Sequence, residues 1–286
     1  MPEPLTRRLW QHYELIHDLI YFSQQARDGA TALGLRGFWM GYFAFRLAPL
    51  GALDAAAATA VCYGFHPSRV ARALPDAWRY ADPASVVAAR QAAADQALRA
   101  VLGPAAESAE LAEAAELAWA AAQQADIAGR PLAAANQALP RPELAHVALW
   151  QASTVLREHR GDGHNAVLIS RALGPLAAHL IKLAAGESDE QLLRIGRGFT
   201  DGDWTAGRRA LLDRGLLDEA GRLTEAGERE HQLVEELTDT ASERPWQALG
   251  EPDSLRLLAL LRPLAGTVAG SGVVPALSPV GVVRSD

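Results

Sequence analysis

Apolar residues recur at the spacing of an α-helix through most of this 286-residue chain, and no strand-like alternation of apolar and polar residues precedes residue 215. Glycine and proline separate the helical segments, as at Gly103-Pro104 and Gly129-Arg130-Pro131. An amphipathic helix buries its apolar face by packing against other elements, so these patterns restrict the chain to a mainly helical fold. We expect residues 1–186 to form a helical N-terminal domain.

The residues after 187 predict a second unit with a different order of elements. Ser188-Asp189-Glu190-Gln191 and Thr200-Asp201-Gly202-Asp203 have the pattern of capping boxes, which begin helices. Leu216–Thr224 predicts one small β-hairpin with Ala220-Gly221 at its turn, and Thr224 then begins a further helix. This order is that of a winged helix-turn-helix, which we expect over residues 187–264.

The last residues, 265–286, are rich in glycine, proline and valine. We expect an extended C-terminal tail there, which either frays or docks on another surface. A homodimer through the winged helix or through this tail is one arrangement that these features allow.

A cluster of charged residues lies between two apolar helical runs in the middle of the chain. It reads Arg157-Glu158-His159-Arg160-Gly161-Asp162-Gly163-His164. Gly161 is typical of a residue that ends a helix and Asp162 of one that caps the next, so we expect a corner between two helices. A purely structural corner would leave Glu158, His159 and His164 unexplained. These residue types can also supply acid–base chemistry.

The densest run of aromatic residues is Gly34–Arg46. Gly37 and Gly41 lie four residues apart, so on a helix they form a smooth face that a backbone or a flat ligand could approach closely. Tight helix packing is the plain interpretation, and the wall of a ligand pocket is the functional one, with the arginines meeting an anionic group. As a pocket wall this run would contribute Arg36, Gly37, Trp39, Met40, Tyr42, Phe43 and Arg46.

His66 precedes Pro67 in Gly64-Phe65-His66-Pro67, so we expect it at the N-cap of a helix. There it either bonds to the backbone of the turn or faces a ligand as an acid, a base or a metal ligand. The predicted pocket joins this loop, the aromatic run and the central cluster. Its candidate catalytic residues are His66, Glu158, His159, Asp162 and His164, and its ligand-binding residues also include Trp150, Arg157 and Arg160.

Composition and motifs exclude several classes of function. A formal net charge of −7 gives no general attraction to nucleic acid or to an anionic membrane. The single cysteine, Cys62, excludes an internal disulfide and fits a reducing cytoplasm. No signal peptide and no apolar stretch of membrane-spanning length is evident, so we expect a cytoplasmic protein without a membrane partner. Neither a P-loop nor a GxGxxG or GxSxG motif is present.

Several motifs resemble known proteins. Arg214-Gly215-Leu216-Leu217 and Leu223-Thr224-Glu225-Ala226-Gly227 are similar to the residues around the wing of a MarR-type winged helix. Together with RGFWMGYFAFR at 36–46, GFHP at 64–67 and LREHRGDGH at 156–164, they resemble an actinobacterial family of winged-helix-containing proteins, also labelled a helix-turn-helix family. This resemblance implies a fold and no catalytic assignment.

The charge of the predicted winged helix argues against DNA binding. Residues 190–262 contain ten arginines, no lysine and fifteen acidic residues, a formal charge of −5. Modules that bind duplex DNA are usually basic, because neutralisation of phosphates supplies much of their affinity. Nucleic acid is therefore an unfavoured partner, with Arg208, Arg209 and Arg222 as the candidate DNA contacts.

These observations favour a small-molecule-binding protein, one form of which is an enzyme. In that form His159 or His164 would be the acid or base, oriented by Asp162 or Glu158, while an arginine held an anionic substrate. The alternatives are a ligand-responsive MarR-like transcriptional regulator and a non-catalytic sequestering binder. The spacing of the histidines matches no standard metal site, and it leaves a metal or haem as an open alternative.

Overall fold

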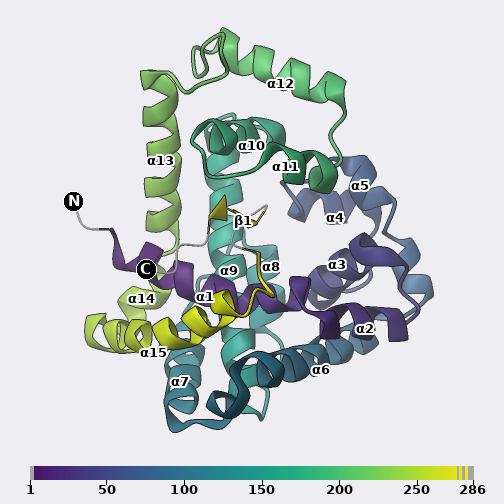
Figure 1. Ribbon diagram of the computed structural model, residues 1–286, viewed down its shortest axis with the longest axis vertical. Coiled ribbons are helices and arrows are strands. Elements are labelled where there is room, and N and C mark those ends of the chain that lie inside the picture. Colours follow the sequence, from purple (N-terminus) through teal and green to yellow (C-terminus); the bar gives the residue numbers. More distant parts are fainter. Residues whose placement is uncertain (1–2, 276, 279–280, 283–286) are drawn as a thin grey trace.

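The computed structural model describes residues 3–275, 277–278 and 281–282 of the chain, and they are mainly helical (Figure 1). The α-helices are α1 (Leu5–Phe22), α2 (Gln24–Ala32), α3 (Gly37–Leu47), α4 (Ala55–Val61), α5 (Pro67–Ala71), α6 (Pro83–Leu102), α7 (Ala109–Gln123), α8 (Pro131–Gln137), α9 (Ala145–Ser170), α10 (Pro175–Ala184), α11 (Glu190–Arg197), α12 (Asp201–Asp213), α13 (Glu225–Ala241), α14 (Arg244–Leu249) and α15 (Glu251–Gly270). Short 3-10 helices are η1 (Ala48–Leu50), η2 (Asp76–Arg79) and η3 (Gly103–Glu107), and the strands β1 (Leu277–Ser278) and β2 (Gly281–Val282) pair antiparallel.

Buried apolar side chains form two clusters. The larger cluster takes residues from α1 to the first half of α9 and again from α14 and α15, and Trp150 and Phe43 are fully buried in it. The smaller cluster takes residues from the end of α9 to α13 and surrounds Trp204. Helix α9 contributes to both clusters and runs through the middle of the molecule (Figure 1).

The expected corner at Gly161 is wrong, because α9 is continuous from Ala145 to Ser170. Gly163 lies where Arg130 crosses the helix, and a Cβ atom there would be 2.5 Å from Arg130 Nη1. The turn to α10 comes later, at residues 171–174, where Ala172 has a left-handed φ of 52°. Gly161 thus lies inside a helix that local signals would end there, and Gly163, two residues later, faces Arg130.

The expected helices of the winged unit are present as α11, α12 and α13. Thr200 and Asp203 form the expected capping box at the start of α12. The expected β-hairpin over Leu216–Thr224 is not supported, because the chain makes one isolated antiparallel bridge, Leu217 with Leu223, and no strand. The pairing is incomplete because the Leu216 NH donates to the Leu211 carbonyl oxygen at the end of α12 and the Arg222 NH donates to the Asp218 carboxylate.

Helices α14 and α15 return to the larger cluster, where Trp246, Leu257 and Leu261 pack with residues of the N-terminal helices. Neither of the expected boundaries, at residues 187 and 264, coincides with a change of cluster, since the smaller cluster begins at Leu168. Helix α15 continues to Gly270, so the first residues of the expected tail are helical, and 276, 279–280 and 283–286 lie outside the described residues. In the described part of the chain no single helix has the length and apolar character to cross a membrane. Two pairs of helices, bent by 85° and 99° between their members, meet these criteria of length and composition only when each pair is counted as one segment.

Candidate functional site

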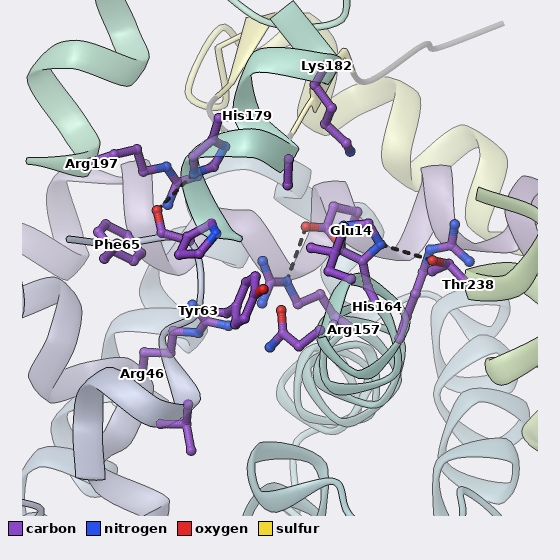
Figure 2. Close-up of a pocket in the computed structure, with 18 of the residues that line it drawn as sticks. Glu14, Arg46, Tyr63, Phe65, Arg157, His164, His179, Lys182, Arg197 and Thr238 are labelled. Atoms are coloured by element: carbon purple, nitrogen blue, oxygen red, sulfur yellow. Dashed lines mark hydrogen bonds and ion pairs between the residues drawn. The ribbon is translucent and has the colours of Figure 1, made fainter. Parts of the chain in front are cut away.

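A cavity of about 170 Å³ lies where helices of both clusters meet, and many of its walls are charged (Figure 2). Helices α1, α3, α9, α10, α11 and α13 and the loop after α4 all contribute side chains to it. The residues that line it are Trp10, Glu14, Tyr42, Arg46, Val61, Tyr63, Gly64, Phe65, Arg157, Arg160, Gly161, His164, Asn165, Leu168, Pro175, Ala178, His179, Lys182, Arg197, Glu235 and Thr238.

Glu158 lies behind the cavity wall, 1% exposed, and joins two of its arginines. Its carboxylate accepts hydrogen bonds from Arg46 Nε and Nη2, each at 2.9 Å, and from Arg157 Nη1 at 2.9 Å. Burial opposes ionisation, but the charges of Arg46 and Arg157 outweigh it and lower the pKa of Glu158 well below its usual range. Glu158 is therefore an ionised structural partner of these arginines.

Positive charge exceeds negative charge around the cavity. The basic residues that line it are Arg46, Arg157, Arg160, Lys182 and Arg197. The acidic residues that line it are Glu14 and Glu235, while Glu158 and Asp239 pair with these cations from behind. Among the described residues, five basic side chains thus line the cavity against two acidic ones, which favours an anion inside it.

Two histidines line the cavity, and each bonds to the protein through one ring nitrogen. His164 Nδ1 lies 2.9 Å from Thr238 Oγ1, and His179 Nε2 lies 2.8 Å from the carbonyl oxygen of Gly64. Burial, together with the nearby charge of Lys182 for His164 and of Arg197 for His179, lowers the pKa of each ring to about 3. Both rings are neutral at pH 7.

Of the residues predicted from the sequence, Tyr42, Arg46, Arg157, Arg160 and His164 line this cavity. The others lie elsewhere. Trp150, Met40 and Phe43 are buried in the larger cluster, Trp39 lies under Arg69, and Arg36 lies over Tyr80. His66 caps α5, as expected, by accepting a hydrogen bond from the backbone NH of Ser68.

The expected orientation of His159 by Asp162 or Glu158 is wrong. His159 Nε2 lies 2.8 Å from Asp126 Oδ1, and neither residue lines the cavity. Asp162 Oδ2 instead accepts hydrogen bonds of 3.0 Å from the backbone NH groups of Leu132 and Ala133. It therefore caps α8, a helix earlier in the sequence than the one expected from local order.

The sequence reasoning did not identify Glu14, Tyr63, His179, Lys182, Arg197 or Glu235 as site residues. One signal was available for Lys182, which is the only lysine of the chain. Glu14 offered another, since it stands between Tyr13 and Leu15 on a helix expected to be amphipathic, and a carboxylate that turns into the core requires a partner. The remaining residues come from segments far apart in the sequence, and no local pattern connects them.

A second cavity, of about 180 Å³, lies between α1, α2 and α3 and is mostly apolar. Gly37 lines it, and Tyr42 lines both cavities. Gly41 also lines it, but a Cβ atom at this glycine would lie 3.0 Å from the Cβ of Ala30. This contact supports the helix-packing interpretation of Gly41.

The surface of the winged unit carries the three candidate DNA contacts. Helix α12 lies at the edge of the molecule (Figure 1), and Arg208 and Arg209 are exposed on it. Arg208 pairs with Glu190 at 2.7 Å and Arg209 with Asp213 at 2.9 Å. Arg222 pairs with Asp218 at 2.8 Å. Each cation thus has an acidic partner, which weakens its attraction for phosphate.

No group of three or more His, Cys, Asp or Glu side chains among the described residues could hold a metal ion.

Compared with known proteins, the chain matches a family described as a helix-turn-helix family over residues 6–275. No curated protein and no solved structure shows a significant match. The expected relation to a helix-turn-helix family is confirmed, while the actinobacterial and MarR-type resemblances stay predictions. Since the match spans nearly the whole chain, the protein belongs to this helix-turn-helix family.

Proposed function

We propose that this protein binds a small anionic molecule in the cavity between its two hydrophobic clusters. The observation that carries the proposal is the basic lining, since among the described residues five basic side chains and two acidic ones line the cavity. Partly buried guanidinium groups are stable only when a counter-charge compensates their lost hydration. Arginine forms paired hydrogen bonds with carboxylates and with phosphates, so either group would suit the site.

The size of the cavity restricts the ligand to a small molecule. Its volume is about 170 Å³. A cavity of roughly 150 Å³ in another protein accepts benzene, so an acid or phosphate ester of similar size would fit. Aromatic residues such as Trp10, Tyr63 and Phe65 provide an apolar part of the wall, as is usual in ligand pockets.

The histidines favour binding over acid–base catalysis. A general base works best when its pKa lies near the working pH. His164 and His179 have pKa values lowered to about 3, so each is a weak base at pH 7. A catalytic version of the site would need the ligand itself to raise these pKa values.

Titration calorimetry with small carboxylates, phosphate esters and sulfonates tests the proposal, using wild type and Lys182→Met. Lys182 lines the cavity, and its Nζ lies 3.9 Å from Glu235, so the substitution removes a cation without breaking a close ion pair. We expect anion affinity to fall by roughly tenfold. The control is Arg141→Met, because Arg141 pairs with Glu116 away from the cavity. Equal affinity in all three proteins, or no binding to wild type, would refute the proposal.

Membership of a helix-turn-helix family favours a second candidate, a ligand-responsive regulator. Helices α10, α11 and α13 contribute cavity residues and pack with α12 in the smaller cluster, so a bound anion would contact the unit that carries the DNA-facing helix. A regulator would shift duplex DNA in a salt-dependent way, and Arg208→Ala would weaken that shift. An unchanged duplex mobility at low salt would remove this candidate and leave anion binding untouched.

A further inference from the structure

The geometry points to a ligand that carries a hydrogen-bond donor, such as a hydroxyl or amino group, beside its anionic group. This inference rests on the anion-binding function proposed above and narrows the class of ligand. It follows from the hydrogen bonds that the two cavity histidines make with the protein, because these bonds determine which ring nitrogen carries the proton.

The hydrogen bonds of Thr238 determine the tautomer of His164. The Thr238 hydroxyl donates to the carbonyl oxygen of Val234, one turn earlier in α13, at 2.7 Å. A hydroxyl has a single proton, so Thr238 Oγ1 can only accept from His164 Nδ1, 2.9 Å away. His164 therefore carries its proton on Nδ1. Its Nε2, on the other side of the ring from Thr238, is a hydrogen-bond acceptor.

The loop after α4 determines the tautomer of His179 in the same way. The Gly64 carbonyl oxygen accepts and cannot donate, so His179 Nε2 carries the proton at their 2.8 Å contact. This leaves Nδ1 of His179 as an acceptor. Figure 2 shows the two rings in different parts of the cavity, His179 beside Phe65 and Arg197 and His164 beside Arg157 and Thr238.

Burial keeps both rings neutral, and the neighbouring cations act in the same direction. Lys182, Arg160 and Arg157 are near His164, where Glu235 opposes them in part, and Arg197 and Lys182 are near His179. The residues that line the cavity thus include cations for an anionic group and two neutral histidines, each with one ring nitrogen that accepts a hydrogen bond. An anion without a donor would displace water from these nitrogens and leave them unpaired, whereas a hydroxylated anion would pair with them.

Two matched ligand pairs test this inference by calorimetry on the full chain. Lactate differs from propionate, and 2-hydroxyethanesulfonate from ethanesulfonate, by one hydroxyl group on the same anionic group. We expect the hydroxylated member of at least one pair to bind about tenfold tighter, since a buried acceptor left unpaired lowers affinity by this order. In His164→Phe, which removes an acceptor and preserves a planar ring, we expect that preference to shrink at least threefold.

The possible results separate this inference from the function on which it rests. If all four anions bind and neither hydroxylated member is preferred, the donor inference is wrong and anion binding stands. If none of the four binds to wild type, anion binding itself is wrong. Nitrogen-15 NMR of the imidazole rings gives a second measurement that does not depend on folding of the variant. A proton on Nε2 of His164 in the wild-type protein would overturn the argument from Thr238.

Discussion

Among single residues, Glu158 has the most demanding electrostatic position, because one buried carboxylate bonds to both Arg46 and Arg157. In Glu158→Gln the two guanidinium groups stay buried and lose this counter-charge. Removing one partner of a buried ion pair typically costs about 3–5 kcal/mol, so we expect the free energy of unfolding to fall by that order. Urea unfolding at pH 7 measures it.

Glu116→Gln is the matched control, because Glu116 pairs with Arg141 on the surface, where solvent screens the pair. A much smaller loss is expected for this variant. If the two substitutions had equal effects, the buried network around Glu158 would contribute no more to stability than a surface ion pair.

His179 predicts a dependence of stability on pH. Its folded-state pKa is lowered to about 3, whereas an unfolded histidine titrates near pH ~6.5. Below that pH the unfolded chain binds a proton that the folded chain does not, so this contribution destabilises the fold as the pH falls from about 6.5 towards 3. His179→Gln keeps a donor for the Gly64 carbonyl and does not titrate.

Between pH 7 and pH 5 we therefore expect His179→Gln to lose about 1–2 kcal/mol less stability than wild type. Urea unfolding of both proteins at the two pH values provides the comparison. Equal losses would mean that burial does not hold the His179 ring in its neutral form.

At the scale of elements, α9 contains two glycines with opposite expected roles. A Cβ at Gly161 would lie 3.6 Å from Arg157 and Glu158 atoms, an ordinary contact, so Gly161→Ala should stabilise the helix by up to about 1 kcal/mol. A Cβ at Gly163 would lie 2.5 Å from Arg130 Nη1. Arg130 donates from Nη1 to the His159 carbonyl and from Nη2 to that of Ala241, each at 2.6 Å, and the new methyl group would displace it.

Gly163→Ala should therefore destabilise the protein by roughly 1–3 kcal/mol, in spite of the better helix propensity of alanine. Denaturant midpoints of the two variants, compared with wild type, show the signs directly. A shift of the same sign for both would contradict this assignment of roles, since the two glycines differ mainly in what faces their α-carbons.

For the whole molecule, the return of α14 and α15 to the larger cluster predicts how the chain tolerates shortening. Trp246, Leu257 and Leu261 are buried there, against helices from the N-terminal part. A chain ending at residue 242 would expose that apolar surface, so we expect it to aggregate or to bind a hydrophobic dye. A short chain that remained soluble and cooperative would show that α14 and α15 are dispensable for the N-terminal fold.

Local chemistry was enough to predict the helical class and several helix starts. The Thr200–Asp203 capping box and the N-cap at His66 involve residues within three positions of each other, and both are present. The helix end expected at Gly161 and the hairpin at Leu216–Thr224 were inferred from equally local signals and are not formed. In the first case the neighbours of Gly161 bond to distant residues, His159 to Arg130 and Asp162 to α8. In the second the NH groups of Leu216 and Arg222 bond to groups outside the ladder.

The sequence alone determined the class of fold, the family resemblance and part of the cavity, because periodicity and short motifs depend on neighbouring residues. Only the tertiary structure decided which partner each charged residue has. Glu158 joined Arg46, His159 joined Asp126 and Asp162 capped α8, each across about 30 to 110 positions of sequence. Such pairings follow from how helices pack, since buried charges bond to whichever groups the packing brings within reach.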